Sequence, residues 1–291
     1  MSIIKIAKTR LLHFIIDHYP KIFIDKNWQA RYGHKVDWDN PRDFNEKMQW
    51  LICYGDTSQW PRLADKYRVR EFIKEKGFES ALVKLYGVWE RAEDIDFESL
   101  PEKFVLKGNH DSASTKIVDK SQGFDRDELV RFYSAKLKQK YGYINCEPHY
   151  NKIKPLVMAE EFLQQEPPFK SLTDYKFWCF DGKAYYVLVM FDRTRETVSK
   201  IIYDLDWNPH PEFLKSYGHF KPDSHFLPKP QRFEEMISMA NHLSEGFPEV
   251  RVDLYEINGK IYFGELTFTG AGGRMVYADS FLKELGSYCV I

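Results

Sequence analysis

The sequence predicts an α+β (α/β) fold in which a helical N-terminal segment precedes short strands that alternate with helices. Helix punctuation is clear over residues 41–78, and β-rich runs follow from Phe78. Two strong hairpin turns, Asp181-Gly182 and Asn258-Gly259, lie in the C-terminal half. The chain has 291 residues, 43% hydrophobic and 29% charged, which suits one large globular domain or two closely packed ones.

Residues 3–16 predict an amphipathic surface helix. Aliphatic residues and Phe14 are interspersed there with Lys5, Lys8 and Arg10, and no small-residue cleavage site follows, so a signal peptide is not expected. We expect the apolar side of this helix to dock on the protein's own core. Peripheral association with an anionic membrane face is the alternative that the same pattern allows.

The remaining elements follow from turn signals and periodicity. One helix is expected to open at Asn40-Pro41 and to run through Trp50, and a second is expected over residues 64–76, ended by Gly77. Strands are expected at 81–86, 103–107 and 156–162, with a helix at 127–141 and loops at 165–168 and 219–230. The two hairpins are expected to pair 175–180 with 183–191 and 251–257 with 260–268.

Charge, cysteines and missing motifs exclude several classes of protein. Lys and Arg number 42 and Asp and Glu 43, so the formal charge is -1 and no global field attracts nucleic acid. The cysteines form no CxxC pair, which argues against a zinc or disulfide framework and favours a reducing cytoplasm. The longest apolar run, 184–191, is far shorter than the roughly 18 residues of a membrane span. Zinc-hydrolase, α/β-hydrolase, P-loop and dinucleotide-binding signatures are absent.

Lys107 is the most informative of three lysines, with Lys66 and Lys176, that lie in or at the ends of apolar segments. The run Phe104-Val-Leu-Lys107 brings an ammonium group to a strand end. Residues 108–114 continue as a loop of small and polar residues, which can fold over phosphates. An ordinary polar turn after a strand is the alternative.

Asp253 and Glu265 lie on the two arms of the Asn258-Gly259 hairpin and are expected to face each other. Like charges directly opposed destabilise a sheet unless a cation lies between them. Mg²⁺, which takes one or two carboxylates plus substrate phosphates, is one candidate cation. Neutralisation by Lys or Arg on a solvated face is the other, and the residues alone leave both open.

Lys176 and Arg193 form a third candidate group around the first hairpin. The segment Asp174-Tyr-Lys176 places the lysine on a strand face, and Arg193 follows the next strand, where a guanidinium can bind an oxyanion. Charged residues at strand ends are also often simply solvated.

The order of these motifs resembles the ATP-grasp superfamily and, within it, the TupA-like family of teichuronopeptide biosynthesis. The resemblance covers about residues 30–275 and is carried by Asn45-Glu-Lys-Met-Gln-Trp50, Ala64-Asp-Lys-Tyr-Arg-Val-Arg70, Leu100-Pro-Glu-Lys-Phe-Val-Leu-Lys-Gly-Asn-His110, Glu160-Glu-Phe-Leu163 and Asp174-Tyr-Lys-Phe-Trp-Cys-Phe-Asp-Gly182. It implies an ATP-grasp fold whose two α+β subdomains clasp ATP. The implied parts are a helical segment packed on the core (1–62) and an ATP-grasp domain (63–291), with a lid subdomain at about 78–160 and a metal-binding lobe at about 161–291.

The resemblance assigns residues to ATP. Those that would contact the phosphates are Lys66, Lys107 and Lys176, under a mobile lid loop of residues 108–114 that contains Gly108, His110, Ser112 and Ser114. Lid closure would exclude water. Those that would contact the nucleoside are Glu160, facing the adenine amino group, the hinge residues Glu161, Phe162 and Leu163, and Asp174, near the ribose.

The transfer and metal sites are implied in the same way. Arg193 would stabilise the transferring phosphoryl group with Lys176 beside it, and Asp253 and Glu265 would hold Mg²⁺. The superfamily usually has Glu-x-Asn where this chain has Glu265-Leu-Thr267, and a hydroxyl is a poorer Mg²⁺ ligand than an amide carbonyl. Because the subfamily tolerates Thr there, Thr267 is retained as a ligand, and the departure bears on the second metal position.

Two further segments are connected with the substrates. The turn Gly270-Ala-Gly-Gly-Arg274 offers backbone N–H groups and a guanidinium that suit a substrate carboxylate, although such turns are usually only turns. Residues 195–230, rich in Tyr, His and Pro, are expected to select the substrate.

The resemblance implies an ATP- and Mg²⁺-dependent ligase that joins a carboxylate to an amine through an acyl phosphate. The expected substrates are an amino acid and a uronic acid carboxylate in bacterial surface polysaccharide biosynthesis (capsule, O-antigen or teichuronopeptide), in the cytoplasm or at the inner membrane face. A glycosyltransferase that binds a nucleotide sugar and needs no ATP is one alternative. A noncatalytic scaffold is another, which the presence of Lys107, Asp253 and Glu265 disfavours.

Overall fold

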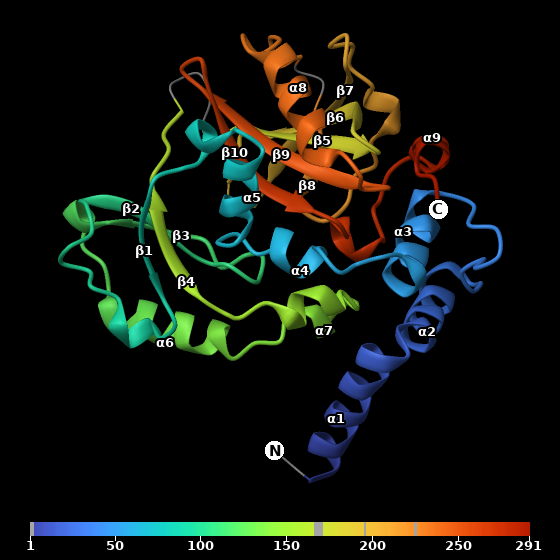
Figure 1. The fold of residues 1–291 in the computed structure, drawn as a ribbon, viewed down its shortest axis with the longest axis horizontal. Coiled ribbons are helices and arrows are strands. Elements are labelled where there is room, and N and C mark those ends of the chain that lie inside the picture. The colour runs from blue at the N-terminus through green and yellow to red at the C-terminus, as the bar shows by residue number, and fades with distance from the viewer. Residues whose placement is uncertain (1–2, 166–170, 195, 224–225) are drawn as a thin grey trace.

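The computed structural model describes residues 3–165, 171–194, 196–223 and 226–291 (Figure 1). Its α-helices are α1 (Ile3–His18), α2 (Pro20–Tyr32), α3 (Phe44–Tyr54), α4 (Trp60–Leu63), α5 (Val69–Glu75), α6 (Arg126–Leu137), α7 (Gly142–Asn145), α8 (Phe233–Ser244) and α9 (Asp279–Tyr288). Its strands are β1 (Leu85–Trp89), β2 (Lys103–Gly108), β3 (Lys116–Asp119), β4 (Val157–Glu161), β5 (Asp174–Phe180), β6 (Lys183–Phe191), β7 (Val198–Asp204), β8 (Phe220–Pro222), β9 (Val250–Ile257) and β10 (Lys260–Thr267). Residues 166–168 of one expected loop, 224–225 of the other, and Arg195 lie outside the described residues.

The strands form two sheets that lie side by side in Figure 1. The small sheet has the order β1-β4-β2-β3 and is antiparallel, and Tyr133 of α6 packs with Phe104 and Leu106 of β2 in its core. The large sheet has the order β10-β9-β5-β6-β7-β8 and is antiparallel except for the β7–β8 pair. Helix α8 packs on β5, β6 and β9. These sheets give the chain its α+β fold.

Both predicted hairpins are confirmed. Their turn residues adopt left-handed backbone angles, with φ of 44° at Asp181, 81° at Gly182, 52° at Asn258 and 72° at Gly259. Such angles match the twist of tight two-residue hairpins, which explains the Asp-Gly and Asn-Gly pairs. In the second hairpin Asp253 and Glu265, expected to be near-opposite, pair directly, because a β-bulge between Phe263 and Glu265 shifts the register by one residue.

The helix expected over residues 64–76 is shorter than predicted, because α5 begins only at Val69. The Asp65 side chain accepts the backbone N–H groups of Tyr67 and Arg68, which offers this segment a turn in place of a helix. The backbone N–H of Lys66 donates to the Asn109 carbonyl at 3.1 Å. Lys66 therefore lies in a turn that contacts the loop after β2. The strand expected at 81–86 also begins late, at Leu85.

The N-terminal segment packs unevenly. Helix α3 lies against α9, where a Cβ on Gly286 would come within 2.8 Å of the Phe44 backbone nitrogen. Helix α1, in contrast, projects from the body (Figure 1), with Leu11 60% and Phe14 51% exposed and Ile16 fully buried. The expectation that the apolar side of α1 docks on the core is therefore wrong for most of the helix. No described helix is long and apolar enough to cross a membrane.

Candidate functional site

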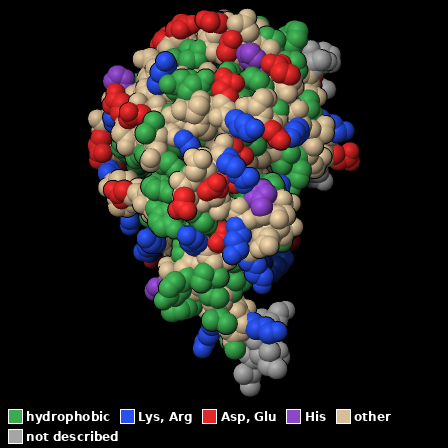
Figure 2. Space-filling model, turned by 90° about the vertical axis from the view of Figure 1, so that its right-hand side faces the viewer, with side chains coloured by type: hydrophobic (Ala, Val, Ile, Leu, Met, Phe, Trp, Pro, Cys, Tyr) green, Lys and Arg blue, Asp and Glu red, His purple; other side chains and the backbone are tan. Residues whose placement is uncertain are grey.

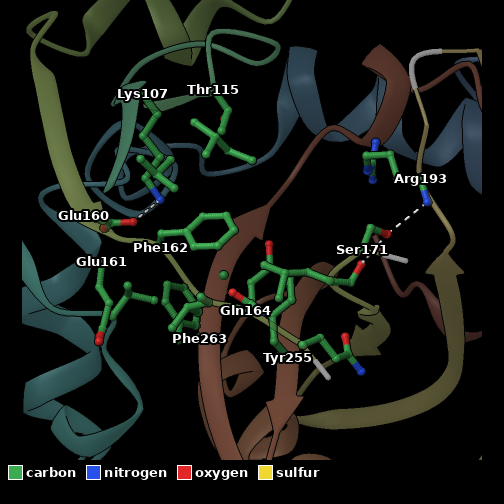
Figure 3. A pocket seen from close by; sticks show the side chains of 17 residues that line it. Lys107, Thr115, Glu160, Glu161, Phe162, Gln164, Ser171, Arg193, Tyr255 and Phe263 are labelled. Carbon is green, nitrogen blue, oxygen red and sulfur yellow. Dashed lines mark hydrogen bonds and ion pairs between the residues drawn. The ribbon is translucent and has the colours of Figure 1, made fainter. Parts of the chain in front are cut away.

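A cavity of about 460 Å³ lies between the two sheets (Figure 3). The small sheet contributes Val105, Lys107, Ile117 and Glu160, and the large sheet contributes Tyr255, Phe263 and Gly264. The segment that joins the sheets, from Glu161 through Phe162 and Leu163 to Gln165, lines the cavity together with Ser171, Leu172 and Arg193. The expected adenine hinge is thus part of the cavity wall, and the cavity combines apolar surface with a few charged groups, as ligand pockets do.

Glu160 does not have a free carboxylate in this cavity. Lys107 Nζ lies 2.5 Å from Glu160 Oε2, and Arg70 Nη1 lies 3.2 Å from Glu160 Oε1, so each oxygen has its own cation. Figure 3 shows Lys107 and Glu160 pointing toward each other beside Phe162. An adenine amino group that contacts Glu160 would therefore share one of these oxygens with its cation or replace the cation.

The loop of residues 108–114, expected to be a mobile lid, is mostly buried and hydrogen-bonded in this structure. Asn109, His110, Asp111 and Ser114 are at most 2% exposed. The Asn109 side chain donates to Asp65 at 2.9 Å and to the Lys154 carbonyl at 3.0 Å, and the Ser114 hydroxyl binds both Asp111 and the Gly108 N–H. Only the tip at Ser112 and Ala113 is exposed, where Ser112 Oγ lies 2.5 Å from the Tyr141 hydroxyl.

His110, expected to contact ATP, is packed into the protein instead. Its Nδ1 lies 3.2 Å from the Asn109 side-chain oxygen and its Nε2 lies 3.2 Å from the Lys136 carbonyl. Burial lowers the pKa of His110, so the ring is neutral at pH 7. Both neighbours are oxygen acceptors, so the neutral ring donates its single N–H to one of them, and His110 packs the loop against α6.

The large sheet carries a dense charge cluster beside the cavity. Lys176 forms an ion pair with Asp253 and lies 3.5 Å from Asp174. Arg251 donates to both oxygens of Asp253, at 2.7 and 2.8 Å, and reaches Glu265 at 3.3 Å. A guanidinium therefore lies between the two opposed carboxylates, which is one of the two arrangements that the sequence left open.

Lys66 links this cluster to the small sheet. Its Nζ lies 3.7 Å from Glu265 Oε2 and donates at 2.6 Å to the carbonyl of Asp111 in the loop after β2. Burial alone would raise the pKa of Glu265, but the positive charges of Lys66, Lys176 and Arg251 lower it to about 2. Burial opposes the charge on Lys176, while Asp174 and Asp253 raise its pKa. Burial also raises the pKa of Asp253, against the opposing effect of Arg251 and Lys176.

Two predicted catalytic residues lie in different places. Arg193 lines the cavity, where its side chain donates to Asp174 at 3.0 Å and its backbone N–H donates to Ser171 Oγ at 2.9 Å. Arg274 donates to Asn145 at 2.7 Å and lines a much smaller cavity behind α2. It is absent from the described lining of the 460 Å³ cavity, so the structure does not bring Arg274 to the cleft with Arg193.

Sequence reasoning missed Arg251 and Arg70. Arg251 stands two residues before Asp253, so the alternation of a strand places both side chains on one face, and this spacing was the available signal. Arg70 comes from α5 and meets Glu160 on β4 across 90 residues of sequence. No local pattern connects those two positions.

Comparison with known protein families identifies this arrangement. The family model described as TupA-like ATPgrasp matches residues 46–290. The chain belongs to the TupA-like ATP-grasp family. It accordingly has the ATP-grasp fold, with one sheet on each side of the cavity. No curated protein matches this TupA-like chain.

Several solved structures resemble this TupA-like protein at low identity. D-alanine–D-alanine ligase from Bacillus anthracis complexed with ATP is 15% identical, with 78% of this chain and 65% of that chain covered and a TM-score of 0.44. The corresponding ligase from Helicobacter pylori is 11% identical over 86% and 67%, with a TM-score of 0.43. The ATP-grasp ligase PsnB with a precursor variant, Mg and ADP is 11% identical over 84% and 66%, with a TM-score of 0.45. The TupA-like chain thus spans about two thirds of these proteins.

The donor set of the TupA-like protein suits Mg²⁺ that is shared with a substrate. Asp253 and Glu265 present carboxylates in direct register, and the Thr267 hydroxyl lies 3.2 Å from Glu265 Oε1. Within the described residues, no group of three or more acidic, His or Cys side chains forms a complete protein metal site. Because Mg²⁺ commonly takes one or two carboxylates and completes its shell with water and phosphate, this set fits the ion.

Proposed function

We propose that the protein is an ATP- and Mg²⁺-dependent ligase that joins a carboxylate to an amine through an acyl phosphate. The observation that carries this proposal is the pair Asp253 and Glu265, opposed across a hairpin and bound to Lys176 and Arg251 beside the cavity between the sheets. Clefts that hold hard carboxylates and fixed cations side by side suit phosphoryl transfer, which depends on positioning and charge stabilisation.

Each part of the site has a chemical task in this proposal. The apolar surface around Phe162, Leu163 and Phe263 receives the adenine, while Lys107 and Lys176 bind phosphate oxygens. Asp253 and Glu265 hold Mg²⁺, with Thr267 as a weaker donor, and the ion neutralises charge on the phosphates. Arg251 turns its guanidinium from the carboxylates toward the transferring phosphoryl group. Arg193 at the cavity wall binds the carboxylate substrate or the departing phosphate.

The reaction balances as two transfers. A substrate carboxylate oxygen attacks the γ-phosphorus of ATP, the bond to the β-phosphate oxygen breaks, and an acyl phosphate and ADP form. The amine then attacks the acyl carbon, phosphate leaves, and the amine loses a proton to give the amide. We infer that the substrates are an amino acid and a uronic acid carboxylate of a bacterial surface polysaccharide (capsule, O-antigen or teichuronopeptide). The TupA-like family membership supports this class of substrate.

The test compares Glu265→Gln with the control Glu256→Gln. Glu256 lies on β9, on the opposite face of that strand from Asp253. Glu265→Gln is expected to lose Mg²⁺-dependent ADP formation, because an amide is a poor substitute for an ionised ligand, while its circular dichroism spectrum is unchanged. Glu256→Gln is expected to keep turnover. Full turnover by Glu265→Gln would contradict the assignment of Glu265 as a Mg²⁺ ligand. Thermal stabilisation by a nucleotide sugar but not by MgATP would favour glycosyl transfer instead.

We also propose that α1 associates peripherally with an anionic membrane at its cytoplasmic face. Leu11 and Phe14 are more than half exposed, Lys8 and Arg10 are exposed beside them, and Figure 2 displays hydrophobic and basic side chains together on the projecting end. Basic helices with apolar faces bind such surfaces. Flotation with vesicles containing phosphatidylglycerol should depend on residues 2–18 and persist with a Lys221→Met control. Flotation that is unchanged by the deletion would refute this role of α1.

A further inference from the structure

Lys200 on β7 is a buried lysine on the face of the large sheet that carries the charge cluster. It is 5% exposed. It pairs with Met190 on β6, and Met190 pairs with Asp174 on β5. Directly paired residues point to the same side of a sheet, so Asp174, Met190 and Lys200 form one row. With neighbouring strands about 4.8 Å apart, Lys200 lies about 10 Å from Asp174 along that row.

Lys200 differs from the other cations of this face in its partners. Lys176 is paired with Asp174 and Asp253, and Arg251 with Asp253 and Glu265. Among the carboxylates of the described residues, none forms an ion pair with Lys200. Its Nζ instead faces the rings of Tyr277, at 5.3 Å from the centroid, and Phe220, at 5.7 Å.

Aromatic rings compensate a buried ammonium group only in part. The attraction of a cation to an aromatic ring is weak, and burial of an ammonium group without an anion costs considerably more than that attraction gains. Burial accordingly lowers the pKa of Lys200. A bound anion would supply the missing charge. Phe220, one of the two rings that contact Lys200, is only partly buried.

The surroundings connect Lys200 to the proposed reaction centre. The Tyr277 ring that contacts Lys200 also packs edge-on against Trp178, at 5.5 Å between centroids. Trp178 pairs directly with Arg251 in the neighbouring strand. Two aromatic side chains therefore separate Lys200 from Arg251. The nucleotide phosphates are proposed to bind near β9 and β10, and Lys200 lies on the other side of Asp174 from those strands.

We propose that Lys200 is an anchor, that is, a residue that binds a carboxylate of a substrate beside the phosphoryl-transfer cluster. This carboxylate is not the one that is phosphorylated. This inference rests on the proposed ligase function for the identity of the anion. A uronate-bearing glycan and an amino acid both supply a carboxylate, so the chemistry is shared and the experiment separates the two sources.

The test measures thermal stabilisation of the full-length protein by sodium glucuronate and by sodium glutamate, against sodium chloride at matched ionic strength. Wild type should respond to one of the two, and that response names the source. Lys200→Met should weaken the response at least about tenfold, because a charge-assisted hydrogen bond is lost. Lys200→Arg should largely restore it, and the exposed neighbour variant Lys221→Met should behave as wild type. All variants should keep their MgATP response.

The outcomes separate a binding role from a structural one. Lys200→Met should melt no lower than wild type without ligand, because it removes a buried unpaired charge. Unchanged carboxylate binding in Lys200→Met, no carboxylate response in wild type, or joint loss of the MgATP response would each overturn the proposal. Lys200-dependent binding in a wild-type protein that forms no ADP would refute the ligase but not the anchor. Turnover with an unchanged KM for the carboxylate in Lys200→Met would refute the anchor alone.

Discussion

The two sheets present the same kind of ion pair to the cavity but balance its charge differently. On the small sheet, Lys107 and Arg70 share the single carboxylate of Glu160. On the large sheet, Lys176 and Arg251 share Asp253, and Asp174 and Glu265 add further carboxylates. The small-sheet group therefore has a single carboxylate between two cations. The large-sheet group has three carboxylates, two of them opposed, and four cations, because Lys66 also pairs with Glu265 and Arg193 with Asp174.

This difference separates two tasks that ATP chemistry requires. A surplus of positive charge attracts phosphate oxygens, and opposed carboxylates attract a divalent cation. The guanidinium of Arg251 keeps Asp253 and Glu265 compatible at close range in the ligand-free protein. Lys66 connects the two groups through Glu265 and the carbonyl of Asp111, so the sheets are coupled through charge as well as through the chain.

The largest difference between the sheets is expected when the guanidinium group of Arg251 or of Arg70 is removed. Arg251→Met leaves Asp253 and Glu265 opposed, and breaking a buried pair costs about 3 kcal/mol of unfolding free energy. Turnover should fall about a thousandfold. Arg70→Met, the matched change on the small sheet, should cost about 1 kcal/mol because Lys107 still neutralises Glu160. Urea denaturation in EDTA measures both variants, and equal losses would contradict the difference between the sheets.

The second comparison concerns the two lysines. Lys107→Met should raise the KM for ATP about 10- to 100-fold, because a phosphate loses a charge-assisted hydrogen bond worth about 1.5 to 3 kcal/mol. Lys176→Met should instead lower kcat more than it raises that KM, since Lys176 contacts Asp253 within the transfer cluster. Steady-state ADP release separates the two patterns. The same change in KM for both variants would show that the sheets do not divide the tasks.

A smaller effect is expected from one glycine on each sheet. A Cβ at Gly264 would lie 3.0 Å from the Asp253 backbone oxygen, so Gly264→Ala should shift the strand that carries the acid pair. At Gly108 a Cβ would lie 2.7 Å from Asp111 Oδ1 and 3.1 Å from Ser114 Oγ, on side chains whose hydrogen bonds close the loop. We expect about 1 to 2 kcal/mol of destabilisation for either change to Ala, with weaker Mg²⁺ activation only for Gly264→Ala. Thermal melts and Mg²⁺ titration of ADP release test this difference.

The smallest effect is the acid sensitivity of the large sheet. The pKa of Glu265 is about 2 in the folded protein against an ordinary value of 4.5, so its stabilising contribution is present above pH 4.5 and lost as pH falls toward 2. The loss should be modest because about a third of the side chain is exposed. Glu265→Gln should lack this component, with Glu161→Gln on the small sheet as the control. The test is to measure the free energy of unfolding of wild type and both variants as the pH is lowered. The assignment would be contradicted if this free energy fell with pH in Glu265→Gln as steeply as in wild type.

Local signals in the sequence predicted much of the fold and part of the site. Asp181-Gly182 and Asn258-Gly259 encode their turns directly, and counting outward from the second turn placed Asp253 near Glu265. A two-residue turn sets the register of the residues next to it, and that register alone would place Asp253 opposite Gly264. A β-bulge between Phe263 and Glu265 makes the direct pair of Asp253 and Glu265, which the turn signal did not predict. The start of α5 was wrong because the Asp65 side chain satisfies the backbone of a turn in place of the helix.

What the sequence by itself determined is most of the elements, the turns of two hairpins and, through the order of its motifs, the family. Only the tertiary structure decided which cations meet which carboxylates. Arg70 meets Glu160, and His110 and Arg274 lie outside the cleft, because of contacts with segments distant in sequence. Arg251 lies between Asp253 and Glu265 because the two strands of the hairpin pair in their shifted register. The physical reason is that turns and strand alternation are short-range properties of the backbone. Ion pairs depend instead on which side chains are brought together when the sheets pack.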